Sequence, residues 1–268
     1  MTAAAGRSRW RPQRVAWTVA AALSAVLVLV PAAWQGWAYA STEHGTLSGA
    51  SGERAVTAVE IEAGGADVRV TPRSDRQVVY QADVRWSLTA PRIEESWLGD
   101  TLKLTPRCPG PADLVESGPG CSVDLDVTVP AGIPVKVTAG SGTVSVSGLA
   151  GAVDAEVGAG RLLLTALRGP LRASVGSGSL EASGLTSPQA DLRAGAGSAV
   201  ARFAAPPDRV TARAGAGRVR LTVPTATRFR VTARAGTGRC DVAPGMHDPA
   251  AAGRLDISAD SGRADAGY

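Results

Sequence analysis

Residues 135–144 read Val-Lys-Val-Thr-Ala-Gly-Ser-Gly-Thr-Val, a Gly-x-Gly tripeptide between two runs of alternating apolar and polar residues. This pattern returns down to the C-terminus, with 18, 18, 19, 20, 21 and 24 residues between successive copies. The Gly-x-Gly copies begin at Gly140, Gly158, Gly176, Gly195, Gly215 and Gly236, and Asp260-Ser261-Gly262 is a degenerate seventh. Periodicity of this length indicates an architecture built from one small repeated unit.

Each repeat predicts two short strands joined at the Gly-x-Gly turn. Side chains one, three and five residues before the first glycine are small or apolar, those four and six residues after it resume this pattern, and the intervening ones are polar. Alternation with period two is typical of half-buried strands. Because two strands cannot bury their apolar sides alone, the units are expected to stack. We therefore predict an all-β protein, a β-solenoid (β-helix-like) of about seven two-stranded repeats over residues 135–268.

The turn glycines are expected because glycine adopts positive φ at little cost, and Asp260 is among the few tolerated alternatives. Residues 56–134 are expected to form an irregular β cap, which starts with a looser copy of the repeat at Val59. Tyr80, Trp86 and Trp97 would fill this cap. Residues 40–55, rich in Ser, Gly and Thr, are predicted to be a linker.

The N-terminal segment predicts a membrane anchor. Val15 to Thr42 carry no charged side chain, and residues 15–39 are long enough for one transmembrane helix or signal anchor. The basic tail of residues 1–14 precedes it, so the repeats would lie outside a cell membrane that the chain crosses once, with the lipid bilayer as a partner. The alternative is a secretory signal cleaved after Ala40, which would release the protein.

The four arginines of this tail supply the whole net charge of +4, and the rest of the chain has 24 basic and 24 acidic residues. A neutral domain argues against nucleic acid as a partner, because nucleic-acid binding needs a basic surface.

Cysteine usage agrees with export. Cys108 and Cys121 flank a loop rich in Pro and Gly that a disulfide could close, although two unpaired thiols remain the alternative. Cys240 is left over, four residues after Gly236 in an otherwise apolar column. We expect its thiol to be reduced, buried and inert.

The sequence offers no catalytic, cofactor or metal site. The two histidines, His44 and His247, have no cluster of metal-ligand spacing around them, and no helix follows a Gly-x-Gly turn to hold a phosphate. The protein is therefore expected not to be an enzyme and to bind no cofactor. Calcium at Asp124 and Asp126, and carboxylate pairs for glycoside hydrolysis, are weaker alternatives.

Arginine recurs beside the turns, so that consecutive layers would stack like charges about 5 Å apart. It stands two residues before the glycine and three residues after it in several copies. These positions are Arg193, Arg213 and Arg234 before the glycine, and Arg161, Arg218, Arg239 and Arg263 after it. Either this is a solvated face neutralised by Asp241, Asp256 and Asp265, or it is a stripe that binds an anionic polymer.

Residues 123–132, Val-Asp-Leu-Asp-Val-Thr-Val-Pro-Ala-Gly, followed by residues 135–144, resemble the bacterial "putative-adhesin" β-repeat domain of unknown function, a family related to the auto-transporter adhesin head domain. The resemblance covers residues 56–265 and is to the membrane-anchored actinobacterial type. It implies a solenoid at the cell envelope and supplies no catalytic residues.

The leading functional prediction is a non-catalytic, extracytoplasmic, adhesin-like or envelope-associated module whose partner is an anionic envelope polymer. The first alternative is an accessory or regulatory subunit of a membrane or envelope-stress system, with a membrane protein as partner. The second is a polysaccharide-active enzyme.

Overall fold

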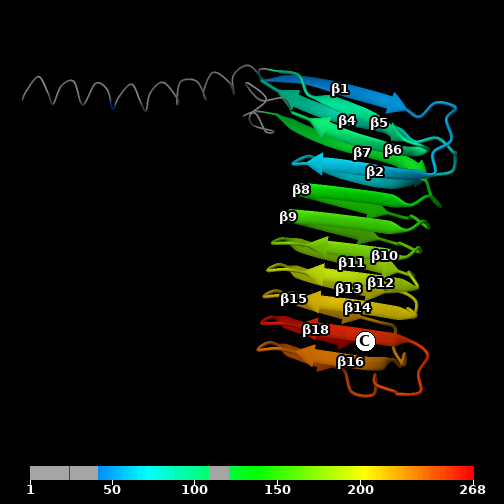
Figure 1. Cartoon of the computed structure of the whole chain (residues 1–268), viewed down its shortest axis with the longest axis vertical. Helices are drawn as coiled ribbons and strands as arrows, with labels where there is room; N and C mark the ends of the chain where they lie inside the picture. The colour runs from blue at the N-terminus through cyan, green and yellow to red at the C-terminus, as the bar shows by residue number, and fades with distance from the viewer. Residues whose placement is uncertain (1–23, 25–41, 88, 109–120) are drawn as a thin grey trace, which may run out of the picture.

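The computed structural model describes residues 24, 42–87, 89–108 and 121–268, and from Thr42 onward this part is all-β (Figure 1). Its strands form one sheet of 19 strands. They are β1 (Glu43–Ala50), β2 (Ala58–Gly64), β3 (Asp67–Arg73), β4 (Val79–Trp86), β5 (Arg92–Leu98), β6 (Thr101–Arg107), β7 (Ser122–Pro130), β8 (Val135–Ser147), β9 (Val153–Thr165), β10 (Leu171–Val175), β11 (Ser179–Leu185), β12 (Gln189–Ala194), β13 (Ser198–Phe203), β14 (Arg209–Ala214), β15 (Arg218–Thr222), β16 (Arg230–Ala235), β17 (Arg239–Val242), β18 (Arg254–Ala259) and β19 (Arg263–Gly267).

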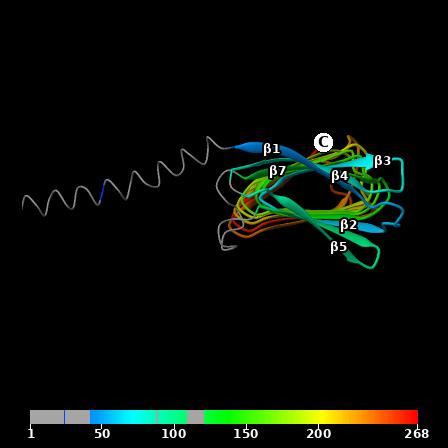
Figure 2. The same cartoon turned by 90° about the horizontal axis from the view of Figure 1, so that it is seen from above.

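The sheet is folded double into two walls that lie over one another (Figure 2). The first wall holds β5, β6, β2, the first halves of β8 and β9, β10, β12, β14, β18 and β16. The second holds β1, β4, β7, β3, the second halves of β8 and β9, β11, β13, β15, β19 and β17. Apolar side chains of both walls meet between them and form the core.

The predicted β-solenoid is wrong, because the sheet does not close on itself. Pairing between β8 and β9 continues through the bend, from Ala139 opposite Val157 to Gly142 opposite Gly160, so the walls are parts of one sheet there. On the opposite side, turns connect the walls. The structure is thus an open sheet folded along the Gly-x-Gly line, with β5 and β1 at one end and β16 and β17 at the other.

Glycine recurs at the bend mainly because stacked turns touch. A Cβ on Gly178 would lie 1.8 Å from the carbonyl oxygen of Gly160, and one on Gly217 would lie 1.9 Å from that of Gly197. Among the Gly-x-Gly glycines only Gly142 has positive φ, 94°. The expectation of positive φ throughout is therefore corrected: close backbone approach selects glycine.

The order of layers departs from the order of the chain. The predicted register is confirmed, but β18 pairs with β14 on one side and with β16 on the other, so the last repeat lies between the fifth and the sixth (Figure 1). Leu255 and Ile257 of β18 are buried, whereas Ala233 of β16 is exposed. In the first wall, the last repeat has larger apolar side chains than the sixth. Placing it at the inner position therefore gives a larger free-energy gain from burial than placing the sixth repeat there would.

The N-terminal part extends the stack and then departs from it. The looser copy at Val59 is confirmed, since Val59 pairs with Val135 and Val68 with Val144. Beyond it the pairings of β4 with β1 and β7, and of β5 with β6, are antiparallel.

Residues Glu43–Ala50, inside the expected linker, form strand β1 instead. Gly45 and Gly49 of β1 leave room for Trp86 and Tyr80, because a Cβ on Gly49 would lie 2.4 Å from the Tyr80 ring. This packing explains why a glycine-rich segment pairs with the cap.

The disulfide between Cys108 and Cys121 is confirmed, with 6.0 Å between the Cα atoms. It ties the end of β6 in the first wall to the start of β7 in the second. The transmembrane helix predicted for residues 15–39 lies outside the described residues, apart from Ser24. Within the described part, no helix has the length and apolar character needed to cross a membrane.

Candidate functional site

Charged side chains on the outer face of the first wall alternate in sign from strand to strand. The parallel register places them in one row, Lys103, Glu60, Lys136, Asp154, Arg172 and Asp191. Neighbouring strands lie about 4.8 Å apart, so each charge has an opposite charge beside it. The row is therefore neutral and stabilises the stacking of layers.

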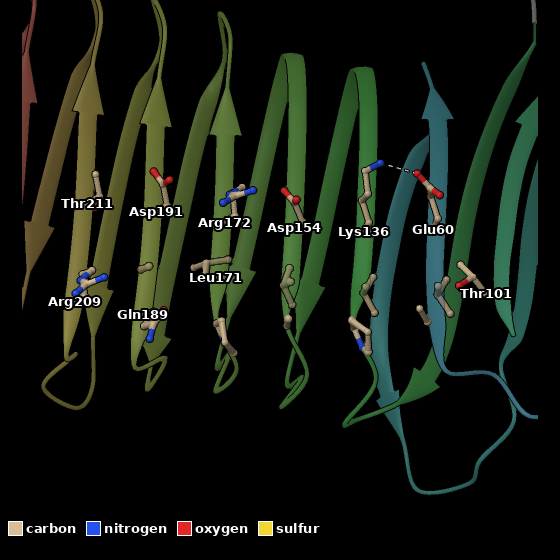
Figure 3. A pocket seen from close by; sticks show the side chains of 18 residues that line it. Glu60, Thr101, Lys136, Asp154, Leu171, Arg172, Gln189, Asp191, Arg209 and Thr211 are labelled. Atoms are coloured by element: carbon tan, nitrogen blue, oxygen red, sulfur yellow. Dashed lines mark hydrogen bonds and ion pairs between the residues drawn. The ribbon is translucent and has the colours of Figure 1, made fainter. Parts of the chain in front are cut away.

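A shallow groove of about 660 Å³ follows this row (Figure 3). Apolar residues that include Pro134, Pro170 and Leu171 line part of it, and Glu60 and Lys136 form an ion pair in it with 2.7 Å between Oε1 and Nζ. The Lys136 ammonium lowers the pKa of Glu60 by donating a hydrogen bond, and the carboxylate raises the pKa of Lys136 in return. Glu60 in the groove is thus engaged in an ion pair, and Asp191 lies 2.7 Å from Arg193.

Beyond Asp191 the row continues with Thr211, Asp256 and Thr232, so the alternation of charge ends, and a cluster of arginines flanks this part of the row. Arg209, Arg254 and Arg230 are neighbours on β14, β18 and β16, in that order. Arg213 and Arg234 lie on the same strands, four residues further along. We call these five residues the arginine patch; all are exposed, and Asp256 of β18 is the acidic residue among them.

Within the described part of the chain, the arginine patch has few ionic partners. Arg213 lies 3.7 Å from Asp191, and Arg230 donates a hydrogen bond to the Pro249 carbonyl. For Arg209, Arg254 and Arg234 the described residues provide no carboxylate within 4.0 Å. The patch consequently carries uncompensated positive charge on one face.

Sequence reasoning missed Arg209, Arg230 and Arg254. Each stands six residues before the first position of its turn, which is Gly215, Gly236 or Asp260. The repeat alignment therefore contained the signal, as an arginine column six residues before the turn, whereas the predicted stripe used only the columns two residues before and three residues after it.

The predicted arginine stripe is only partly continuous. Arg193 and Arg213 are neighbours, but Ser258 lies between Arg213 and Arg234, so the expectation of consecutive layers is wrong for Arg234. On the second wall, three predicted members do form an unbroken row, Arg218, Arg263 and Arg239. The two sets occupy different walls on either side of the Gly-x-Gly bend.

Acidic neighbours neutralise the centre of the row on the second wall. Arg263 contacts Asp241 at 2.6 Å and Asp265 at 2.8 Å, and these carboxylates raise the pKa of its guanidinium. Arg220 lies 3.8 Å from Asp265 as well. The first wall therefore presents the stronger positive surface.

The sequence has a matching charge asymmetry. Residues 43–134 contain 8 basic and 14 acidic residues, and residues 135–268 contain 16 basic and 10 acidic residues. The neutrality inferred for the whole domain thus combines an acidic N-terminal part with a basic C-terminal part.

Cys240 is free, as predicted, but it is half-buried rather than buried. It lies on β17, at the end of the stack. Among the described strands, β17 pairs with β19 alone. The Cys240 thiol donates a hydrogen bond to the Arg234 carbonyl at 3.1 Å, and burial raises the pKa of the thiol.

His247, Asp126 and Asp124, which the sequence singled out, have structural contacts. His247 accepts a hydrogen bond through Nδ1 from the backbone N–H of Val231. Asp126 lies 3.0 Å from Arg69, and Asp124 lies 3.9 Å from Arg85. Among the described residues, no group of three or more His, Cys, Asp or Glu side chains is placed to hold a metal ion.

Several solved structures are similar to this chain at low sequence identity. A "putative adhesin" from Bacteroides fragilis is 12% identical, with 84% of this chain and 97% of that chain covered and a TM-score of 0.47. A "putative adhesin" from Parabacteroides merdae is 11% identical, covering 84% of this chain and 96% of that one, with a TM-score of 0.45. A "putative lipid binding protein" from Parabacteroides distasonis is 12% identical, covering 83% and 96%, with a TM-score of 0.41.

No model of a known protein family matches the chain, and no curated protein sequence matches it either. A likeness at these identities and TM-scores carries no argument about function.

Proposed function

We propose that the chain is a non-catalytic, adhesin-like binding module of the cell envelope that holds anionic polymers on the arginine patch. The single observation that carries the proposal is the row of Arg209, Arg254 and Arg230 in adjacent strands. Three like charges about 4.8 Å apart repel one another unless anions compensate them. A polymer with many anionic groups would supply that compensation.

The position of the patch supports this proposal. It lies near the end of the stack that is farthest from β1, where the described chain begins (Figure 1). If residues 15–39 anchor the protein in the cell membrane, the acidic cap would face the bilayer and the arginine patch would project outward. Localisation as a single-pass membrane protein with an extracytoplasmic domain belongs to the same proposal.

The groove of the first wall supports a structural rather than catalytic reading. Its charges alternate in sign and Glu60 pairs with Lys136, so a substrate bound there would have to displace that ion pair. The proposed activity is therefore binding without chemical conversion. Membership in the adhesin β-repeat family is part of this proposal.

Binding of the full chain, purified in detergent, to poly(glycerol phosphate) and to alginate tests the proposal. We expect binding that weakens at least tenfold between about 50 mM and about 200 mM salt, since counterion release and screening act on each contact. The triple variant Arg209→Ser, Arg230→Ser and Arg254→Ser is expected to lose most of it.

The matched control is the triple variant Arg69→Ser, Arg73→Ser and Arg85→Ser, which removes the same charge from the acidic part of the chain. It should bind as the wild type does. Equal loss in both variants would show a general charge effect, and no binding by the wild type would refute the proposal.

A further inference from the structure

We propose that the open end of the stack, at β16 and β17, takes up an extended acidic segment of a partner protein as an added strand. This surface adjoins the arginine patch and shares Arg230 and Arg234 with it, but its pairing groups lie along the strand edges rather than on the outer face of the first wall. It consists of the free edges of the two strands and the core positions that they leave uncovered.

The edges are free among the described strands, because β16 pairs only with β18 and β17 only with β19. The backbone N–H of Val231 points away from β18, since it donates to His247. Alternation along the strand places the N–H and C=O groups of Ala233 and Ala235 on the same outer side. An edge of this kind is a template for pairing with another strand.

Core positions are also left open at this end. Ala233 lies beside Ile257 and Ala235 beside Ala259 in the ladder, yet both alanines are exposed whereas their neighbours are buried. On β17, Cys240 and Val242 are half-buried, although their neighbours Ala264 and Ala266 are buried. One more layer with small apolar side chains would cover these positions as every inner layer covers the next.

A loop already covers the beginning of this edge. The Met246 carbonyl accepts a hydrogen bond from the Phe229 N–H, and the Asp248 N–H donates to the Phe229 carbonyl. The isolated bridge between Phe229 and His247 marks this short pairing. The loop therefore pairs with Phe229, just before β16 begins, and the edge from Ala233 onward is left for a partner.

Charge selects the occupant. The outward side chains next to the free edges include Arg230, Arg234 and Arg239, and the acidic Asp241 among them is engaged by Arg263. A second copy docking through the same edge would place arginine against arginine, which is unfavourable. An extended segment that alternates small apolar residues with Asp or Glu matches both the open core positions and the arginines.

The test measures fluorescence anisotropy of a labelled peptide of about eight residues that alternates Asp and Val, added to the full chain in detergent. We expect saturable binding that weakens at least tenfold when alternate peptide nitrogens are N-methylated, because these can no longer donate to the edge. The N-methylated peptide keeps its charge and leaves the protein unchanged. Equal binding of both peptides, or no binding of either, would overturn the proposal.

The same proposal can be tested by changing the protein instead of the peptide. Ala233→Pro removes an outward N–H without removing a bond to β18, as proline is tolerated on edge strands. We expect it to weaken peptide binding at least tenfold, while its far-ultraviolet circular dichroism and its binding to poly(glycerol phosphate) stay unchanged. The triple variant Arg209→Ser, Arg230→Ser and Arg254→Ser should still bind the unmethylated peptide more tightly than the N-methylated one. The edge proposal can therefore be tested even if the arginine patch binds no polymer. Concentration-dependent self-association that Ala233→Pro abolishes would instead identify a second copy as the occupant and refute an acidic partner.

Discussion

Arg213 of β14 lies directly opposite Ser258 of β18 in the parallel ladder. The serine comes from the last repeat of the chain, whereas a stack in chain order would place Arg234 there. This neighbour separates two arginines that the repeat alignment assigns to consecutive layers. It also fixes which strand edges remain free at the end of the stack.

Cysteine cross-linking tests this relationship. In a Cys240→Ser background, the pair Arg213→Cys and Ser258→Cys should form a disulfide under mild oxidation. Adjacent strands lie about 4.8 Å apart, within the roughly 4.4–6.8 Å between Cα atoms that a disulfide spans. The pair Arg213→Cys and Arg234→Cys, about two layers apart, should not form one. Peptide mapping by mass spectrometry distinguishes the outcomes, and cross-linking of the second pair alone would show that the layers follow chain order.

The second glycine of each turn should be among the least replaceable residues. A Cβ on Gly178 would lie 1.8 Å from the Gly160 carbonyl oxygen, so Gly178→Ala must push two layers apart. We expect it to lower the free energy of unfolding by about 3 kcal/mol, the upper end of the usual cost of overpacking a core. Gly132→Ala is the control, because a Cβ on Gly132 would meet no atom within 4 Å and the φ of this residue is not positive. Urea unfolding that ranks the two variants equally would contradict close approach as the reason for glycine.

The ion pair between Glu60 and Lys136 should contribute to stability in a limited pH window. The pKa of Glu60 is lowered, so its contribution is present above the ordinary carboxylate pKa of 4.5 and is lost as the pH falls through the lowered value. Since the pair is partly exposed, Glu60→Gln should cost about 0.5 kcal/mol at neutral pH and nothing at about pH 2. Thermal unfolding of both proteins across this range measures the effect, and a constant difference at every pH would exclude this linkage.

The thiol of Cys240 should react slowly at neutral pH. Burial raises its pKa, so the thiol remains protonated. Labelling by iodoacetamide should be slower in the native protein than in guanidinium chloride at the same pH, and should accelerate as the pH rises. Native and unfolded rates that agree at pH 7 would show that the thiol is an ordinary exposed one.

Local register could be predicted from the sequence, but the order of layers could not. Val135, Val153 and Leu171 align because each precedes its turn by the same number of residues, and the structure pairs them as aligned. All repeats share that pattern, so the apolar side chains align whichever two repeats are neighbours. The separation of 24 residues between the last two turns was the only sign that the chain could step past a layer.

The cap and the arginine patch were predicted incompletely for related reasons. Gly45 and Gly49 reduce the strand propensity of β1, and only the aromatic rings of Trp86 and Tyr80 on the paired strand make them suitable. The patch depends on Arg254 lying between Arg209 and Arg230, which the chain order hides. In both cases the deciding contact comes from a distant part of the sequence.

Core truncation gives the most direct energetic test of the layer order. Leu255 is 1% exposed between β14 and β16, whereas Val231 is half-buried on the outermost strand. Leu255→Ala should therefore lower the free energy of unfolding by about 2–5 kcal/mol, since a cavity forms between the walls. Val231→Ala should cost about 1 kcal/mol or less, because solvent already reaches that side chain. If the layers followed the chain, Val231 would be enclosed and Leu255 would lie at the open end, so urea unfolding would give the opposite ranking.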